Sequence, residues 1–228
     1  MNFWKEKSVL ITGGTSGLGL ALALELDRLG ARVAVVARGR EKLEQLPASI
    51  ARIQGDVADK LSIHRIYAEA ITKLGQIDVL FNNASELGPT PLRLLLDSEC
   101  EDLSQVLKTN LIGPFRLSKL VLPEMILRRF GIVVNISSDA AVSAYPRWGA
   151  YSVSKVALDH LTRIFQVELE DTGVKFLALD PGDMDTPMHL AAIPDANRAE
   201  LRRPEDSAYK ILSEIAAERF QPLRRRIL

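Results

Sequence analysis

The sequence has a single cysteine, Cys100, in 228 residues, so an internal disulfide is excluded. No group of cysteines and histidines has the spacing of a zinc site, and we expect no metal. The chain also lacks a run of about 18 apolar residues, which a transmembrane helix needs. Its start, MNFWKEK, does not resemble a signal peptide because charged residues precede the first apolar run. These absences favour a cytoplasmic protein.

The chain has no excess of charge of either sign. Its 29 Lys and Arg residues balance 29 Asp and Glu residues, and the isoelectric point is about 6.9. Such a chain has no overall basic field to attract nucleic acid or an anionic membrane, and we expect neither as a partner. Repeats and linker-like shifts in composition are absent too. With 47% apolar residues, residues 1–228 are expected to form one domain.

What the sequence does contain is a regular alternation of short apolar runs and helical patterns. The run at 33–37 is apolar throughout, which is typical of a parallel strand covered on both faces. Strands are predicted at 9–12, 33–37, 77–81, 132–137 and 174–179, with a further one ending before Gly55. Helices are predicted at 18–29, 41–46, 60–74, 99–129, 151–170 and 205–218. This alternation predicts an α/β fold, a Rossmann-type, doubly wound parallel sheet with helices on both faces.

Two segments do not fit this alternation. Residues 186–204 contain Pro187, Pro194 and Pro204 and show no sustained periodicity, so we interpret them as an irregular loop that forms a substrate lid. The tail, FQPLRRRIL, is compatible either with a short edge strand or with a frayed end.

A glycine-rich segment follows the first predicted strand directly. Its glycines permit a tight turn, close approach of backbone N–H groups to a pyrophosphate, and close packing of helix on strand. The segment therefore predicts a dinucleotide site made by Gly13, Thr15, Ser16, Gly17, Leu18 and Gly19. The alternative is a turn that only joins a strand to a helix, and the strand before and helix after make it the weaker interpretation.

The end of the second predicted strand bears on the choice of cofactor. An acidic residue there binds the ribose 2′-hydroxyl of NAD, but this chain has Ala37, Arg38, Gly39 and Arg40. A guanidinium can bind a 2′-phosphate through two parallel N–H bonds, so NADP is preferred over NAD. The alternative is that Arg38 and Arg40 are solvated charges at a helix start.

Polar residues follow the next two strands. Asp56, with Val57 after it, is placed to meet the adenine amino group, although Asp56 or Asp59 can also cap the next helix. Asp59 is the favoured cap. Asn83 and Ala84 follow the later strand, where side-chain amides can hold loop backbone near the cofactor.

The most specific pattern combines a serine, a tyrosine and a lysine. Ser138 lies thirteen residues before Tyr151, and Lys155 lies four residues after it, so Tyr151 and Lys155 leave the same face of a predicted helix. An ammonium there, with an oxidised nicotinamide, can lower the phenol pKa from about 10 to near 7, a change of about 4 kcal/mol. Tyr151 then becomes a general acid or base near neutral pH. The alternative interpretation is an ordinary helix-surface pair, which is what a lone tyrosine and lysine at this spacing usually form.

Together these motifs resemble the short-chain dehydrogenase/reductase family, of its classical type. The resemblance includes TGGTSGLG at 12–19, NNA at 82–84, SS at 137–138, YSVSK at 151–155 and DPGDMDT at 180–186. It implies that Ser138 donates a hydrogen bond to the substrate oxygen and that Tyr151 donates the proton. Lys155 would tune the tyrosine and bind ribose, and Asn110 would organise a proton relay.

Pro114 gives an independent reason for the role of Asn110. It lies four residues later and lacks the N–H that a helix would direct at the Asn110 carbonyl, which is left free to hold a water. Gly113 and Pro114 also explain a kink in the long helix. The resemblance further places four residues around the nicotinamide: Pro181, Gly182, Met184 and Thr186.

The chain departs from the family pattern in two places. Ser85 stands where the family usually has glycine, a change expected to tighten the turn without affecting the chemistry. Asp183 and Asp185 make the 180–186 segment acidic; either one could face the substrate and disfavour anions, although short acidic loops are usually solvated. The side chains expected to line the substrate cleft are Tyr145, Trp148, Met188 and His189.

The expected activity is NADPH-dependent interconversion of a ketone or aldehyde and an alcohol, with Tyr151 as general acid and base. Enoyl reduction is disfavoured because that branch spaces its tyrosine and lysine farther apart. The alternative from another class is a regulator that senses NADP(H) without turnover. Relatives commonly pair through the helices corresponding to 99–129 and 151–170, so we expect a homodimer or homotetramer.

Overall fold

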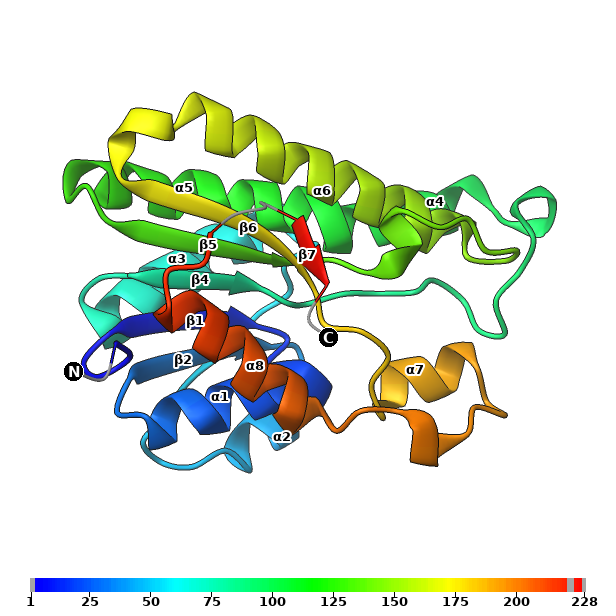
Figure 1. Ribbon diagram of the computed structural model, residues 1–228, viewed down its shortest axis with the longest axis horizontal. Helices are drawn as coiled ribbons and strands as arrows, with labels where there is room; N and C mark the ends of the chain where they lie inside the picture. The colour runs from blue at the N-terminus through cyan, green and yellow to red at the C-terminus, as the bar shows by residue number, and fades with distance from the viewer. Residues whose placement is uncertain (1–2, 221–223, 227–228) are drawn as a thin grey trace.

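The computed structural model describes residues 3–220 and 224–226. Within these ranges, seven strands form one parallel sheet in the order β3-β2-β1-β4-β5-β6-β7, so the order reverses between β1 and β4 (Figure 1). The strands are β1 (Ser8–Thr12), β2 (Arg32–Ala37), β3 (Ala51–Gln54), β4 (Val79–Asn82), β5 (Gly131–Ile136), β6 (Val174–Asp180) and β7 (Arg224–Arg226). The predicted doubly wound α/β sheet is confirmed.

Helices cover both faces of this sheet. One face carries α1 and α8, and the opposite face carries α3, α5 and α6 (Figure 1). The helices are α1 (Gly17–Arg28), α2 (Arg40–Glu44), α3 (Lys60–Leu74), α4 (Cys100–Leu107), α5 (Gly113–Leu127), α6 (Gly149–Glu168), α7 (Pro187–Ala192) and α8 (Pro204–Ala216). Within the described residues, no helix combines the length and apolar character that crossing a membrane requires.

Two hydrophobic cores result because successive side chains of a strand point to opposite faces. In β1, Val9 and Ile11 join the core beneath α1 and α8, whereas Leu10 joins the core beneath α3 and α5. Phe176 of β6 belongs to the second core and stacks on Phe165 of α6, with 4.7 Å between ring centroids. Strands buried on both faces therefore have apolar residues pointing to both, which explains the continuous apolar runs in the sequence.

Helix α3 begins and ends where its sequence predicts. The Asp59 carboxylate accepts hydrogen bonds from the backbone N–H groups of Leu61 and Ser62, at 3.1 and 3.0 Å. Gly75 ends the helix with φ at 79°, a left-handed conformation that glycine adopts without strain. Asp59 is therefore the helix cap, and the Asp56 side chain is not needed for this purpose.

The prediction of one long helix at 99–129 is wrong in its middle. Helices α4 and α5 are separated by a π-turn, Lys108–Ile112, in which the Gly113 N–H donates to the Lys108 carbonyl, five residues back. Pro114 supplies no N–H to continue the α-helical pattern at this point. Asn110 lies in the π-turn, and such turns are frequent at functional sites.

The segment at 186–204 was predicted to be irregular, which is correct only in part, and its role as a substrate lid stays a prediction. It contains α7 and a 3-10 turn, Arg198–Glu200. The Thr186 hydroxyl caps α7 by accepting from the His189 N–H at 3.2 Å. With six residues, this helix is too short to give a periodic signal.

The C-terminal tail contains a strand at the sheet edge. Strand β7 pairs in parallel with β6, with Asp180 opposite Arg226. The Arg226 Nε lies 3.9 Å from the Asp180 Oδ2, which joins the tail to the carboxyl end of β6. The edge-strand alternative is therefore correct for residues 224–226, and the rest of the predicted tail, 221–223 and 227–228, lies outside the described residues. The expected single domain over 1–228 and the expected homo-oligomer stay predictions.

Replacing Phe176 by alanine should reduce the free energy of unfolding by about 3–5 kcal/mol, because a cavity replaces a fully buried, stacked ring. Chemical denaturation followed by circular dichroism measures the change. Leu61→Ala is the control; this side chain is 79% exposed, and its loss should change stability by no more than about 0.5 kcal/mol. Equal losses in both variants would contradict the description of this core.

Candidate active site

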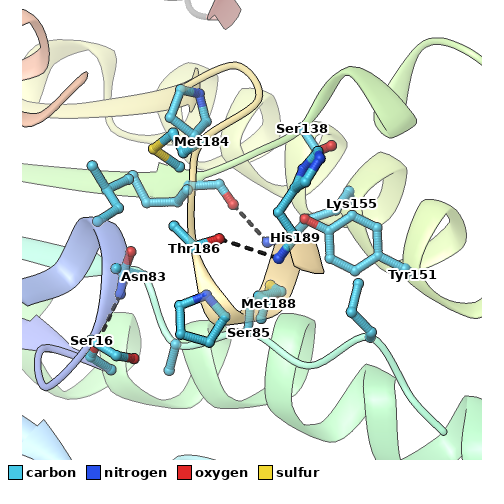
Figure 2. A pocket seen from close by; sticks show the side chains of 18 of the residues that line it. Ser16, Asn83, Ser85, Ser138, Tyr151, Lys155, Met184, Thr186, Met188 and His189 are labelled. Carbon is cyan, nitrogen blue, oxygen red and sulfur yellow. Dashed lines mark hydrogen bonds between the residues drawn. The ribbon is translucent and has the colours of Figure 1, made fainter. Parts of the chain in front are cut away.

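A cleft of about 810 Å³ opens at the carboxyl ends of the strands, beside the point where the strand order reverses (Figure 2). All predicted site residues except Gly19 and Asn110 line it: Gly13, Thr15, Ser16, Gly17, Leu18, Arg38, Asp56, Val57, Asn83, Ala84, Ser138, Tyr151, Lys155, Pro181, Gly182, Met184 and Thr186. Tyr145, Trp148, Met188 and His189, which were expected at the substrate end, also line the cleft.

The glycine-rich loop forms the floor of one end of the cleft. Gly13 has φ at 68°, and a Cβ there would lie 2.9 Å from the Ala84 Cα. A Cβ on Gly19 would overlap the Gly13 carbonyl oxygen. Gly19 therefore allows helix α1 to approach the loop and acts by packing, while Gly13, Gly17 and their neighbours face the cleft.

Asn83 and Thr12 join this loop to the end of β4. The Asn83 Nδ2 donates to the carbonyl oxygens of Thr12 and Gly13, at 2.9 and 3.1 Å. The Thr12 Oγ1 accepts from the N–H groups of Asn83 and Ala84, each at 3.1 Å. The side-chain amide thus holds loop backbone, as the sequence indicated for this asparagine.

Basic side chains lie at the end of β2, but they differ from the predicted pair. Arg38 is exposed and lines the cleft, and Lys42 of α2 lines it as well. The Arg40 Nε instead donates to the Glu44 Oε1 at 2.8 Å, one helical turn along α2, so the structure assigns Arg40 the solvated role that was its alternative. Lys42 could not be identified from the sequence because the start of α2 decides which side chain faces the cleft.

Asp56 borders the cleft beyond β3. Its Oδ1 accepts from the Ala58 N–H at 2.9 Å, and its own N–H donates to the Ser62 hydroxyl at 3.0 Å. These bonds fix the carboxylate beside Val57 in the cleft wall. Its expected contact with adenine stays a prediction.

Asn110 is buried and lies behind the cleft. Its Nδ2 donates to the Glu86 carbonyl and to the Ser154 hydroxyl, both at 2.9 Å, and its Oδ1 accepts from the Glu86 N–H at 2.8 Å. The side chain therefore joins the loop after β4 to helix α6. This bonding was not foreseen, because the sequence argument concerned only the Asn110 backbone carbonyl.

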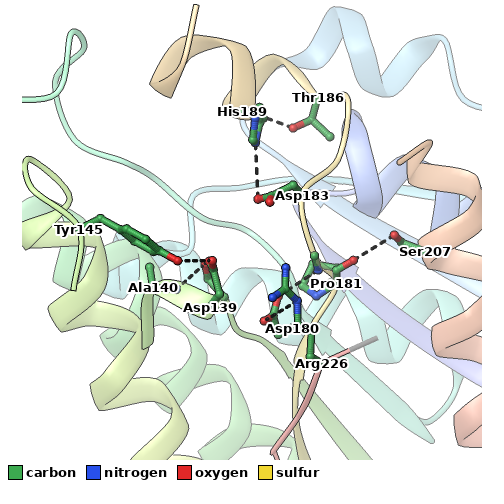
Figure 3. Close-up of polar contacts among 12 residues, drawn as sticks. Asp139, Ala140, Tyr145, Asp180, Pro181, Asp183, Thr186, His189, Ser207 and Arg226 are labelled. Atoms are coloured by element: carbon green, nitrogen blue, oxygen red, sulfur yellow. Dashed lines mark hydrogen bonds and ion pairs between the residues drawn. The ribbon is translucent and has the colours of Figure 1, made fainter. Parts of the chain in front are cut away.

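Ser138 lies at the end of β5 in a hydrogen-bonded group. Its hydroxyl donates to the Asp139 Oδ1 at 3.0 Å and accepts from the Ala140 N–H at 3.2 Å. The other carboxylate oxygen of Asp139 accepts from the Tyr145 hydroxyl at 2.9 Å (Figure 3). Asp139 thus orients two hydroxyl groups at the substrate end, a role that no motif signalled.

Tyr151 and Lys155 lie together on α6 and are both buried. The Lys155 Nζ donates to the Ile136 carbonyl at 2.8 Å and lies 5.3 Å from the centroid of the tyrosine ring. Burial raises the pKa of Tyr151 to about 12. The Ser138 and Ser85 hydroxyls lower this pKa, while the carboxylates of Asp180 and Asp139 raise it further.

The pKa near 7 expected from the sequence applies to the complex with an oxidised nicotinamide and stays a prediction; in the protein alone the pKa is shifted upward. Burial, which penalises the phenolate, is the largest cause of this upward shift. The same burial lowers the pKa of Lys155 to about 8, although Asp159 opposes that change. Part of the lysine charge is therefore lost near neutral pH, and the protein alone keeps Tyr151 protonated.

The segment after β6 forms the opposite wall. The Asp180 Oδ1 accepts from the Gly182 N–H at 2.9 Å, and the Pro181 carbonyl accepts from the Ser207 hydroxyl of α8 at 3.1 Å (Figure 3). These contacts fix the turn before Met184 and Thr186, which face the cleft.

The two acidic residues of this segment differ. Asp183 lines the cleft, with its Oδ1 3.9 Å from the His189 Nδ1 (Figure 3). Asp185 instead accepts two hydrogen bonds from the Arg198 guanidinium, at 3.0 and 2.9 Å. Asp183 is therefore the acidic residue that faces the substrate end. Within the described residues, no cluster of three or more His, Cys, Asp and Glu side chains is arranged to hold a metal ion.

A family model described as short chain dehydrogenase matches residues 7–197. The chain belongs to the short-chain dehydrogenase/reductase family. This short-chain dehydrogenase is thus an oxidoreductase.

Two relatives and one solved structure illustrate the similarity. The 2-(R)-hydroxypropyl-CoM dehydrogenase of Xanthobacter autotrophicus is 34% identical, over 80% of this chain and 76% of the relative. The 3-oxoacyl-(acyl-carrier-protein) reductase FabG of Thermotoga maritima is 33% identical over 80% of this chain and 76% of its own. A short-chain dehydrogenase from Streptomyces avermitilis has a similar structure, with a TM-score of 0.87 and 28% identity over 98% of this chain and 88% of its own.

The buried Lys155 should make the stability of the free protein depend on pH. Its pKa is about 8 when folded and near 10.5 when unfolded, so between these values the unfolded chain binds more protons and stability rises with pH. From pH 7.5 to 9.5 we expect the free energy of unfolding to rise by about 2 kcal/mol more in the wild type than in Lys155→Met.

Urea denaturation at a series of pH values measures this difference. Lys73→Met, at an exposed position of α3, should keep the wild-type dependence on pH. A Lys155→Met profile parallel to that of the wild type would show that burial does not shift this lysine.

Proposed function

We propose that this short-chain dehydrogenase interconverts a ketone or aldehyde and an alcohol with NADP(H) as cofactor. One observation carries the proposal: Ser138, Tyr151 and Lys155 meet at one end of a cleft whose other end is bordered by a glycine-rich loop and two basic side chains. The relatives are named as a dehydrogenase of a hydroxypropyl compound and a reductase of a 3-oxoacyl compound, which supports carbonyl and alcohol chemistry.

The cleft suits a dinucleotide. At the loop, glycine at position 13 lets the backbone pack against Ala84, because a Cβ there would lie 2.9 Å from the Ala84 Cα. The start of α1 directs backbone N–H groups and the positive end of its dipole to a pyrophosphate. Arg38 and Lys42 are available for a 2′-phosphate at the far end. When bound, the nicotinamide supplies or accepts the hydride.

The proton is handled by Tyr151. In reduction its O–H bond breaks as the substrate oxygen gains the proton, and in oxidation the transfer is reversed. The Ser138 hydroxyl, which donates to Asp139 in the structure, turns its donor to the substrate oxygen and fixes its position. Lys155 stabilises the phenolate and binds ribose, and the Asn110 carbonyl holds a water through which Tyr151 regains its proton.

Replacing Tyr151 by phenylalanine should lower carbonyl reduction by at least about 1,000-fold, because the ring remains and the acid is removed. The decrease of NADPH absorbance with a panel of aliphatic and aromatic ketones and aldehydes measures the rate. Binding of NADPH, followed by its fluorescence, should change by less than about threefold. If the wild type binds NADPH and reduces no carbonyl, the alternative of a dinucleotide-sensing regulator is favoured.

Replacing Arg38 by aspartate should change the cofactor preference. Loss of the guanidinium and repulsion between a carboxylate and the 2′-phosphate should lower the ratio of kcat/KM for NADPH to that for NADH by about 10- to 100-fold. Arg40→Asp is a matched control, because this arginine pairs with Glu44 instead of lining the cleft. Its ratio should change by less than about threefold. Equal effects of the two substitutions would contradict the phosphate assignment.

A further inference from the structure

Ser85 lies in the loop after β4, where its neighbours on both sides are fixed. Before it, the N–H groups of Asn83 and Ala84 donate to the Thr12 hydroxyl, each at 3.1 Å. After it, the N–H and carbonyl of Glu86 are both bonded to the Asn110 side chain, at 2.8 and 2.9 Å. Four hydrogen bonds to the adjacent backbone therefore fix the loop on both sides of Ser85.

The hydroxyl held in this way is buried. Within the described part of the chain, the Ser85 Oγ makes no hydrogen bond of ordinary length. Buried polar atoms are almost always bonded, so an unbonded one at a candidate active site indicates a partner that is present only at another stage of the reaction. Ser85 lines the cleft with Ser138 and Tyr151 (Figure 2).

The neighbouring atom that can become an acceptor is the phenolic oxygen of Tyr151. The Ser85 hydroxyl is near enough to lower the pKa of this residue, as Ser138 does from the end of β5. A neutral phenol can donate its own proton, whereas a phenolate can only accept. The hydrogen bond from Ser85 is therefore strongest after Tyr151 has lost its proton.

We propose that Ser85 is a hydrogen-bond donor to the Tyr151 oxygen, stabilising the phenolate formed during proton transfer while the Ser138 hydroxyl holds the substrate oxygen. The inference rests on the proposed function, in which the O–H bond of Tyr151 breaks and the substrate O–H bond forms. The Ser85 O–H bond stays intact throughout. The family usually has glycine at this position, which offers no hydroxyl. The proposal therefore gives Ser85 a part in the chemistry, in place of the expectation that it only tightens the turn.

Several groups act on Tyr151 from the surrounding elements. Asp180 at the end of β6 and Asp139 after β5 disfavour the phenolate, and burial disfavours it more. Lys155 on the same helix lies over the ring. In the protein alone, two hydroxyls therefore oppose two carboxylates. Once Ser138 donates to the substrate, Ser85 is the hydroxyl of this pair that remains for the phenolate, so its removal should be visible in the dependence of the reaction on pH.

The test is Ser85→Ala in the NADP⁺ complex. The pH at which kcat/KM for alcohol oxidation levels off should rise by about one unit, and the rate below that pH should fall about 10-fold. Ser152→Ala is the matched control, because its Oγ is also buried and unbonded within the described residues, but Ser152 does not line the cleft. Its profile should match that of the wild type. Equal profiles for Ser85→Ala and Ser152→Ala would overturn the proposal.

A second measurement separates this inference from the proposed function. Tyrosinate absorbance of the NADP⁺ complex, taken as the difference from Tyr151→Phe, reports the Tyr151 pKa without turnover, and Ser85→Ala should raise this pKa by about one unit. If Ser85→Ala raises the Tyr151 pKa but the wild type reduces no carbonyl, the inference about Ser85 stands and the proposed function is contradicted. If the wild type reduces carbonyls but Ser85→Ala leaves the Tyr151 pKa unchanged, the proposed function stands and the inference is contradicted. Ser85→Gly, the residue usual in the family, should behave like Ser85→Ala, and Ser85→Thr should restore the wild-type value.

Discussion

The Asn110 side chain makes three hydrogen bonds on which the arrangement of the site depends. Two of the bonds, to the backbone of Glu86, join the π-turn before α5 to the loop after β4. The third, to the Ser154 hydroxyl, joins the π-turn to α6. That hydroxyl in turn donates to the Tyr151 carbonyl at 2.6 Å. On the other side, Asn83 bonds the same loop to Gly13. The cofactor loop and the catalytic helix are thus connected through one continuous set of hydrogen bonds, so their separation is fixed by bond geometry as well as by packing.

A second set of buried polar groups lies beneath this one. The Asn82 Nδ2 donates to the Asn135 Oδ1 at 2.8 Å, and the Asn135 Nδ2 donates to the Thr162 Oγ1 at 2.8 Å. Thr162 donates to the Leu158 carbonyl at 2.8 Å. Because an unbonded polar group in this core would be costly, the set fixes how β4, β5 and α6 lie relative to one another. It supports the ends of β4 and β5, which Asn83 and Ser138 follow.

The features that could be predicted from the sequence depend on local rules, and those that could not depend on contacts between distant segments. The Asp59 cap needs only neighbouring N–H groups, and the glycine-rich loop is recognised by its position between a strand and a helix. By contrast, a π-turn has no hydrophobic period of its own, and α7 is shorter than any window in which a period can be seen. Ser85 is 66 residues from Tyr151 in the sequence, so the approach of its hydroxyl is a property of the fold. The upward shift of the Tyr151 pKa in the protein alone could not be predicted for the same reason: burial is not visible in a tyrosine and lysine spaced four apart.

The balanced net charge of the chain conceals a separation of charge along the cleft. Arg38 and Lys42 lie at one end, and Asp139, Asp180 and Asp183 gather at the other. Burial raises the pKa of Tyr151 most, and the carboxylates of Asp180 and Asp139 raise it further, so the phenolate is disfavoured in the free protein. A protonated phenol is the form required to donate to a carbonyl oxygen, whereas alcohol oxidation must begin from the phenolate. In the proposed reaction, burial and these carboxylates therefore make the phenolate dependent on every donor and positive charge that the site can place around it.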